Sequence, residues 1–303
     1  MNADAALLQL LRLLKDRAYR FIAVTPATHA RVLARPCEQP DVRDIFGWNR
    51  PFFAHELDPE LLQCLHDSEM VEADGKKLRS MVRVASLGDD LFLHSAFPTT
   101  ASDAVFFGPD TYRFIRFVRE RLPLVKPAPA SVIDMGAGSG AGAINIARML
   151  RGARITAIDI NPAALRLAAI NAEAAGVRIE TLLSPEISDE ADLVIANPPY
   201  IMDAGKRAYR DGGELLGGQV ALDWSQQALR ALRPGGTMLL YTGASVADGC
   251  APLIGALEQA CAAISADIEI EDIDPDVFGE ELDQPAYAEV ERIAVIGATI
   301  RKR

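Results

Sequence analysis

The chain has 303 residues, half of them hydrophobic and 24% charged, which is the composition of a globular protein long enough for two domains. Its net charge of −11 is unfavourable for a protein that grips nucleic acid through phosphates, although residues 1–100 are nearly balanced. The cysteines form no CxxC pair and the histidines are scattered, so we expect neither a metal site nor a disulfide scaffold. No apolar run reaches the roughly 18 residues of a membrane span and no signal peptide is recognisable, which predicts a cytoplasmic protein.

The first part of the chain predicts a small α+β region. Leucines at helical spacing indicate a helix over residues 5–19, and a second helix is expected over 58–69. Two strands are expected over 78–86 and 91–95, joined by a turn at Gly88. Helix, turn, strand, turn, strand is the order of a winged-helix-like module. We therefore expect an accessory or substrate-recognition domain over residues 1–104.

The remainder, residues 105–303, predicts a second domain of the α/β class. A helix is expected over 110–122 with Asp110 as its N-cap, and strands and helices alternate from residue 131 onward. Such alternation indicates a Rossmann-like, doubly wound and mostly parallel sheet with helices on both faces. The expected strands include residues 132–134, 154–160, 179–183, 192–196, 237–242, 268–273 and 290–296, and the expected helices cover 141–150, 162–175, 220–232 and 251–264.

A glycine-rich loop follows the first strand of this domain, and its candidate binding residues are Asp134, Gly136, Ala137, Gly138 and Gly140. Glycines let the backbone turn sharply and approach a ligand closely, and the helix that follows offers unpaired N–H groups. Ligands of open α/β sheets bind at this edge. The loop alone fits a dinucleotide-binding enzyme as readily as other classes.

An acidic residue, Asp159, ends the next strand and is followed by Ile160. A carboxylate at that place can accept hydrogen bonds from both hydroxyls of a ribose. The alternative is that Asp159 only caps the helix beginning at Pro162. Its spacing from the glycine loop favours the ribose, and we expect both residues to bind a cofactor.

The tetrapeptide Asn197-Pro198-Pro199-Tyr200 comes directly after the buried-type strand 192–196. The two prolines fix their φ angles, so the carbonyl of Pro198 and the side-chain oxygen of Asn197 become two fixed acceptors for the hydrogens of an NH2 group. Tyr200 can cover a planar group by stacking. Orienting a conjugated, weakly nucleophilic nitrogen toward an electrophile is how such a site would promote transfer. A plain turn is the alternative.

Residues 105–303 resemble class I methyltransferases that bear an N-P-P-Y motif, and among them HemK/PrmC-type protein-(glutamine-N5) methyltransferases. The resemblance rests on residues 134–140, Asp159, the helix with Asn171, and residues 197–200. It implies that the glycine loop and Asp159 bind S-adenosylmethionine, with Asn197 near both cofactor and substrate. Gly108-Pro109-Asp110-Thr111 resembles the segment that folds over the cofactor. The sequence departs from the family in two places, at residues 183–186 and in its N-terminal part. The first departure leaves open which residue contacts the adenine.

The expected function is S-adenosylmethionine-dependent N-methylation of a planar amide or amino nitrogen. A protein glutamine side chain is the first candidate acceptor, followed by a small-molecule amine or amide and then by a nucleobase, which the acidic charge disfavours. The alternative from another class is a regulatory protein that binds S-adenosylmethionine. A protein or small-molecule partner is expected, with no membrane and no metal.

Overall fold

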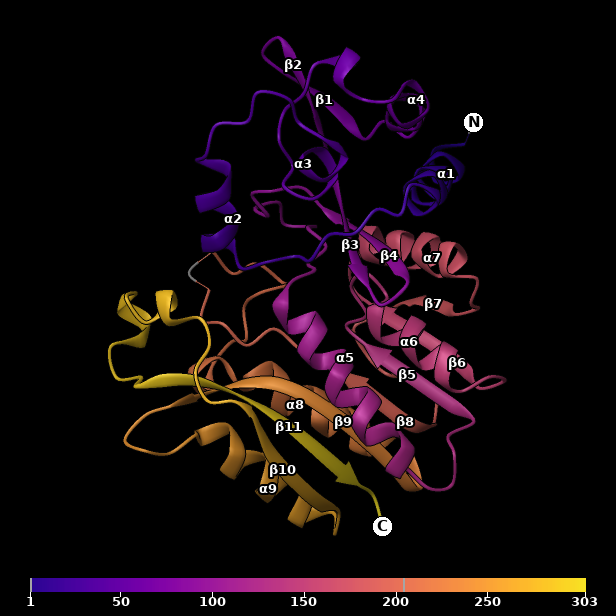
Figure 1. The fold of residues 1–303 in the computed structure, drawn as a ribbon. Coiled ribbons are helices and arrows are strands. Elements are labelled where there is room, and N and C mark those ends of the chain that lie inside the picture. Colours follow the sequence, from indigo (N-terminus) through magenta and orange to yellow (C-terminus); the bar gives the residue numbers. More distant parts are fainter. Residues whose placement is uncertain (1, 204) are drawn as a thin grey trace.

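We describe residues 2–203 and 205–303 of a computed structural model of the protein. The N-terminal part contains four helices and two β-hairpins and sits above the large sheet in Figure 1. None of the helices in the described residues is long and apolar enough to cross a bilayer. The elements of this part are α1 (Ala3–Asp16), α2 (Pro26–Leu33), α3 (Val42–Phe46), α4 (Pro59–Asp67), β1 (Val71–Asp74), β2 (Lys77–Ser80), β3 (Val82–Leu87) and β4 (Asp90–Ser95), with a 3-10 turn at Ala54–Glu56.

A seven-stranded sheet forms the core of the C-terminal part, residues 105–303, in the order β10-β11-β9-β8-β5-β6-β7. Its middle strands are parallel, whereas β11 runs antiparallel to both β9 and β10. The mostly parallel, doubly wound sheet that the sequence predicted is therefore confirmed. Its strands are β5 (Ser131–Met135), β6 (Arg154–Asp159), β7 (Glu180–Leu183), β8 (Ala191–Ala196), β9 (Leu232–Val246), β10 (Asp267–Asp274) and β11 (Arg292–Arg301).

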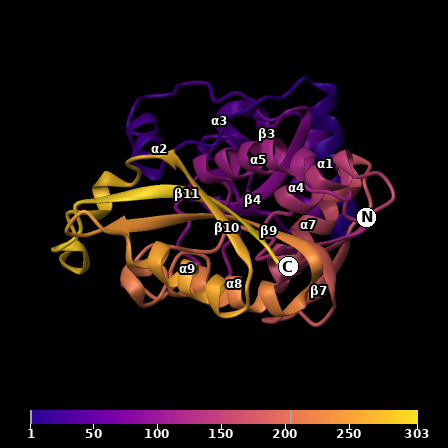
Figure 2. The same ribbon diagram turned by 90° about the horizontal axis from the view of Figure 1, so that it is seen from below.

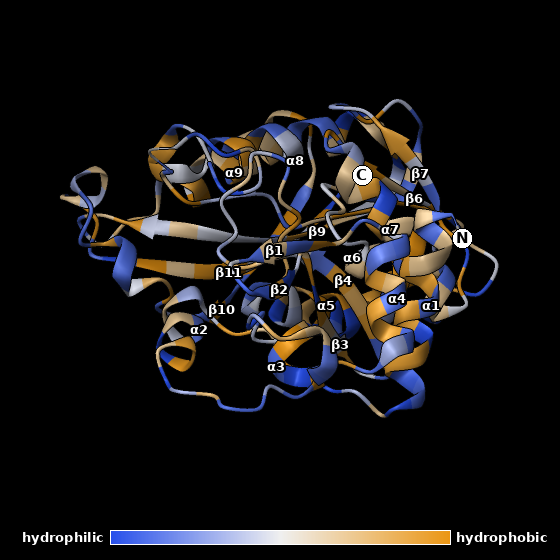
Figure 3. Ribbon diagram, turned by 90° about the horizontal axis from the view of Figure 1, so that it is seen from above, coloured by the Kyte–Doolittle hydropathy of each residue, from blue (hydrophilic) through white to orange (hydrophobic). Residues whose placement is uncertain are grey.

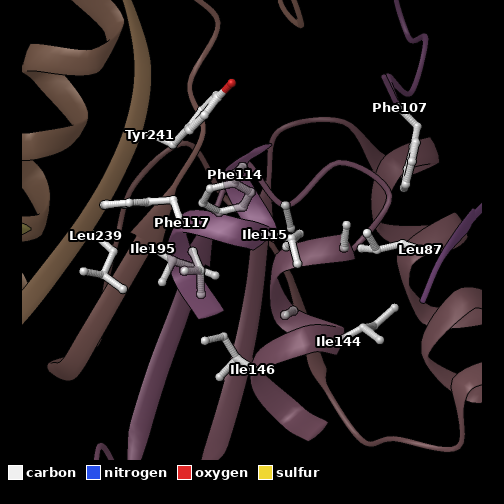
Figure 4. Close-up of a cluster of buried hydrophobic side chains, with 14 of the residues drawn as sticks. Leu87, Phe107, Phe114, Ile115, Phe117, Ile144, Ile146, Ile195, Leu239 and Tyr241 are labelled. Carbon is white, nitrogen blue, oxygen red and sulfur yellow. The ribbon is translucent and has the colours of Figure 1, made fainter. Parts of the chain in front are cut away.

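Helices cover both faces of the sheet, as Figure 2 shows. On one face lie α5 (Pro109–Arg121), α6 (Ala141–Met149) and α7 (Pro162–Ala175), and on the other α8 (Gln219–Ala231) and α9 (Pro252–Ala263). In Figure 4, Phe114 and Phe117 of α5 pack with Ile195 and Leu239 of the sheet. Short 3-10 turns complete the chain at Leu122–Leu124, Leu215–Gly217, Gly279–Glu281 and Pro285–Tyr287.

The N-terminal part shares its hydrophobic core with the C-terminal part. Leucines of α1 and α4 form one buried cluster with Ala164, Leu167 and Ile170 of α7. Figure 3 shows the hydrophobic residues of these three helices where the helices lie side by side. The boundary that we predict between residues 104 and 105 therefore crosses a common core, and the division into two domains stays a prediction.

The structure corrects four details of the sequence-based prediction. The single strand expected over 78–86 is wrong, because the chain bends between β2 and β3. At the bend, the Ser80 hydroxyl donates to the Val82 carbonyl and accepts from the Val82 N–H. The two hairpins form separate two-stranded sheets, and the winged-helix prediction is not confirmed. Asp110 is not the N-cap of α5, since Gly108 holds that place. The strand expected over 237–242 is longer, because β11 pairs with β9 from Thr237 to Val246.

Candidate active site

The glycine loop connects β5 to α6 at the carboxyl edge of the sheet. Gly136, Gly138 and Gly140 have φ angles of 70°, 53° and 79°, which L side chains rarely adopt. A Cβ on Gly136 would lie 2.2 Å from the Trp224 ring, and one on Gly140 would lie 2.9 Å from Ala168 Cβ. Glycine is therefore required for both the backbone conformation and the packing of the loop.

Asp134 is buried beneath this loop rather than facing solvent. Its Oδ2 accepts a hydrogen bond of 2.7 Å from the backbone N–H of Ala143, in the first turn of α6. Burial raises the pKa of the Asp134 carboxyl to about 7, opposed by that hydrogen bond and reinforced by the charge of Asp159. A Cβ on Gly142 would lie 2.6 Å from Oδ2, so the carboxylate packs tightly against the helix. The carboxyl group thus anchors the loop to α6 in this structure.

Asp159 lies at the end of β6, beside the loop. Its Oδ2 accepts from the Gly138 N–H and its Oδ1 from the Asn161 N–H, both at 2.9 Å. Burial raises its pKa, against the effect of these backbone hydrogen bonds. Beside it, Ile160 and Leu183 are 57% and 58% exposed, which is unusual for large aliphatic side chains. A carboxylate next to an exposed apolar surface fits a ribose that carries a planar base.

Sequence reasoning missed Leu183, although a leucine at the carboxyl end of the strand next to Asp159 was a usable signal. Ser184, which follows it, donates its backbone N–H to the Asp159 carbonyl, and its hydroxyl bonds to the backbone of Glu186. The departure from the family pattern at residues 183–186 is therefore a local turn beside an exposed leucine.

The Asn-Pro-Pro-Tyr segment begins where β8 ends, next to β5 with its glycine loop. Asn197 is half-buried, and its amide group forms no hydrogen bond with another described residue. Pro198 is buried and Pro199 is half-buried. The structure thus brings a free side-chain amide to the same edge as the glycine loop and Asp159.

Tyr200 is only 6% exposed, so most of its ring contacts protein. A Cβ on Gly243 would lie 2.0 Å from its Cδ2, and its ring meets Phe278 edge-on with centroids 6.0 Å apart. Stacking of Tyr200 on a substrate remains a prediction.

The hydroxyl of Tyr200 donates a hydrogen bond of 2.7 Å to Oδ2 of Asp110, whose other oxygen accepts one of 3.0 Å from Tyr241. The Tyr241 hydroxyl points away from the hydrophobic cluster in Figure 4. The Arg113 guanidinium adds positive charge beside Asp110: its Nη1 lies 3.4 Å from Asp110 Oδ1, and its Nη2 lies 3.0 Å from Asp274 Oδ2. Burial nevertheless raises the pKa of Asp110 and that of Tyr200. Sequence reasoning assigned Asp110 to a cap and missed this network.

The segment after Tyr200 is held by charged contacts. Asp203 pairs with Arg207 and Arg210, and Arg210 also pairs with Glu281. These contacts hold the pKa of Asp203 at about 2, chiefly through the hydrogen bond from Arg207. Tyr209 donates to the Thr99 carbonyl at 2.7 Å and so joins this segment to the N-terminal part.

Asn171 of α7 connects β4 with the glycine loop and is completely buried. Its Nδ2 donates to the carbonyls of Ser139 (2.9 Å) and Leu93 (3.2 Å), and its Oδ1 accepts from the Leu93 N–H at 2.9 Å. The side chain of Asn171 therefore connects the N-terminal part to the glycine loop.

Residues 119–247 match the family model described as the methyltransferase small domain. This match, with the doubly wound sheet, confirms the predicted class I methyltransferase fold, and with it S-adenosylmethionine as the cofactor of the class. The chain therefore carries an S-adenosylmethionine-dependent methyltransferase domain.

Within this class the chain is similar to release factor glutamine methyltransferases. It is 33% identical to that of Geobacter sulfurreducens over 137 residues, which are 40% of this chain and 48% of the relative. The Bordetella pertussis relative is 30% identical over 182 residues, 58% of this chain and 63% of the relative. A 4-amino-L-phenylalanine/4-methylamino-L-phenylalanine methyltransferase of Streptomyces pristinaespiralis is 37% identical over 129 residues, 37% of this chain and 43% of the relative. The chain spans about half the length of the first of these relatives.

Proposed function

We propose that this protein transfers the methyl group of S-adenosylmethionine to a planar amide or amino nitrogen, with a protein glutamine side chain as the first candidate acceptor. The observation that carries the proposal is the free amide of Asn197 at the end of β8, beside the glycine loop. Similarity to release factor glutamine methyltransferases supports the amide acceptor. We also propose that the protein acts in the cytoplasm and that its partner is the protein that carries the acceptor.

The cofactor half of the site is assigned to the glycine loop and the end of β6. Asp159 would accept the ribose hydroxyls, and Ile160 with Leu183 would cover the base, because both present apolar surface beside that carboxylate. Gly136, Ala137, Gly138 and Gly140 would line the amino-acid end. Asp134 would support this end of the site from beneath the glycine loop, through its hydrogen bond with the Ala143 N–H.

The acceptor half is assigned to residues 197–200. The side-chain oxygen of Asn197 and the carbonyl of Pro198 would accept the two N–H hydrogens of the acceptor and aim its lone pair. S-adenosylmethionine supplies the electrophilic methyl group. As positive charge develops on the nitrogen during transfer, the same two oxygens would stabilise it. Pro199 stiffens the turn, and Tyr200 closes it.

A small-molecule amine is the second candidate acceptor. The Streptomyces pristinaespiralis relative, matched at 37% identity, is named for an aromatic amine. Nucleobases are disfavoured by the net charge of −11. A purely regulatory role is disfavoured because the Asn-Pro-Pro-Tyr segment is intact.

Isothermal titration with S-adenosylmethionine and S-adenosylhomocysteine tests the cofactor half. We expect saturable binding that Asp159→Ala weakens by an order of magnitude or more, since about two hydrogen bonds to a charged acceptor are lost. Unchanged affinity in Asp159→Ala would remove the ribose assignment.

Labelled methyl transfer to a release factor, and separately to 4-amino-L-phenylalanine, tests the acceptor half. Asn197→Ala should abolish transfer while cofactor affinity stays within a few-fold of wild type. Transfer at the wild-type rate by Asn197→Ala would refute the clamp. Transfer to one acceptor alone distinguishes the two candidates.

A further inference from the structure

The N-terminal part contains a buried arginine without an acidic partner. Arg83 of β3 is 6% exposed, and its bonds are to neutral groups, from Nε to the Ser95 carbonyl (2.8 Å) and from Nη2 to Thr99 Oγ1 (3.2 Å). Among the described residues it forms no ion pair. Burial lowers its pKa to about 10, so the guanidinium stays charged at neutral pH. Buried charges are normally paired, because removing a charge from water is costly.

Two buried histidines lie beside this arginine with unsatisfied ring nitrogens. His94 is directly opposite Arg83 in the β3–β4 hairpin, so their side chains share one face. It is completely buried, and neither of its ring nitrogens has a hydrogen-bond partner. His29 of α2 donates a hydrogen bond from Nε2 to the Trp48 carbonyl at 2.9 Å, whereas its Nδ1 has no partner. Burial, and next the charge of Arg83, lower the pKa of both imidazoles, that of His29 to about 4.

Aromatic rings connect these three basic side chains. Phe97 stacks on His29 with ring centroids 4.1 Å apart, and the Arg83 guanidinium carbon lies 5.8 Å from the same ring. Phe107 stacks on His94. Phe107 also precedes Gly108, the N-cap of α5, and α5 carries Asp110. The cluster therefore lies between the N-terminal hairpin and the segment that leads into the candidate active site.

The cluster lies outside the part of the chain that matches the family model, residues 119–247. The glycine loop and Asp159, by contrast, lie within the matched region. Leu93, which precedes His94 in β4, is hydrogen-bonded to Asn171, and Asn171 also bonds to Ser139 of the glycine loop. The position thus suits the recognition of the molecule that receives the methyl group.

We propose that Arg83, His94 and His29 form a buried site for a carboxylate group of the methyl acceptor. A planar carboxylate can accept two parallel N–H bonds from the guanidinium fork, one bond from the N–H of His94, and one from Nδ1 of His29 when that ring is protonated. Water could satisfy the imidazoles but would leave the guanidinium without a counter-charge. The proposal rests on the proposed function only in assigning the carboxylate to the acceptor.

The first test observes the histidines directly and needs no methyl transfer. Imidazole nitrogen signals of histidine-labelled protein are followed during titration with sodium acetate at constant ionic strength, and His94→Phe assigns the His94 signal. We expect a saturable shift and a raised pKa of His94, because a nearby anion favours the protonated imidazole. In Arg83→Met the affinity for acetate should fall on the order of tenfold or more, and Arg83→Lys should restore part of it.

Arg148→Met is the matched control, since Arg148 pairs with Asp90 at the other end of β4. It should leave the acetate titration unchanged. No saturable shift in the wild type, or the same shift in Arg83→Met, would overturn the site. Binding of inorganic phosphate without acetate would overturn the carboxylate and indicate a phosphorylated ligand.

The second test assigns the source of the carboxylate. S-adenosylhomocysteine, which has a carboxylate, and methylthioadenosine, which has none, are titrated into wild type and Arg83→Met. Equal affinities in both proteins support the acceptor, whereas a loss confined to S-adenosylhomocysteine would overturn it in favour of the cofactor. Absence of any cofactor binding in the wild type would refute the proposed function and leave the acetate result standing. Displacement of acetate by 4-amino-L-phenylalanine but not by its carboxamide supports a free amino acid, and displacement by a blocked acidic peptide supports a protein acceptor.

Discussion

Asp110 is expected to position Tyr200, and Asp110→Asn tests this. The carboxylate is 4% exposed and receives two tyrosine hydroxyls, at 2.7 and 3.0 Å. An asparagine keeps the shape but presents an NH2 group to one of the two tyrosine oxygens and loses the charge. A hydrogen bond to a charged group contributes about 1.5–3 kcal/mol, so the free energy of unfolding should fall by roughly 2 kcal/mol, less the relief from removing a buried charge.

The effect on catalysis should exceed the effect on cofactor binding. Tyr200 lies close in sequence to Asn197 and Pro198, the proposed acceptor-orienting residues, and small displacements of reacting groups reduce rates by up to about 100-fold. We expect kcat for Asp110→Asn to fall on the order of 10- to 100-fold, with cofactor affinity within a few-fold of wild type. Denaturant unfolding and single-turnover transfer of labelled methyl groups measure the two effects.

Tyr241→Phe is the matched control for this prediction. It removes the second hydrogen bond to Asp110 but leaves the bond from Tyr200, so stability should fall while kcat stays near the wild-type value. Wild-type kcat in Asp110→Asn would refute the positioning role. An equal loss of kcat in Tyr241→Phe would show that general loosening of the fold, rather than Tyr200, is responsible.

Three other substitutions test neighbouring parts of the site. In the folded protein the pKa of Asp134 is raised from 3.8 to about 7, so the folded state binds this proton more tightly than the unfolded state. The free energy of unfolding of the wild type should therefore fall by up to about 4 kcal/mol as pH rises from 4 to 7. Asp134→Asn should flatten this pH dependence in unfolding titrations. Gly243→Ala should displace the Tyr200 ring and lower kcat, whereas Gly255→Ala on α9, where a Cβ meets nothing within 4 Å, should leave kcat unchanged. Asn171→Ala leaves three buried backbone groups without partners and should cost about 3 kcal/mol in denaturant unfolding; a loss below 1 kcal/mol would contradict the proposed link.

The C-terminal part was predictable because its signals are local. The helix over 162–175 was predicted with its observed bounds, since Asn161 caps it, Pro162 begins it and Gly176 adopts a left-handed conformation after it. The glycine loop and Asp159 have fixed places at the ends of their strands. Each of these features is specified by residues within a few positions of one another.

The missed features depend on contacts between distant segments. Asp110 meets Tyr200 and Tyr241 from 90 and 131 residues away, so the sequence around Asp110 gives no sign of these two hydrogen bonds. The pairing of Arg83 with His94 required the register of a hairpin whose first strand was predicted with the wrong start. Long-range partners, rather than local propensity, therefore limited the prediction of the site.

The shared core has a consequence for how acceptor recognition and catalysis are coupled. Asn171 bonds β4 to the glycine loop, and Tyr209 bonds the segment after Tyr200 to Thr99, which also accepts from Arg83. A ligand that draws Arg83 toward its carboxylate would act on the second connection, because Thr99 is bonded to both Arg83 and Tyr209. We therefore expect occupation of the N-terminal cluster to affect the segment after Tyr200, so that the proposed carboxylate site and the proposed acceptor-orienting turn are coupled.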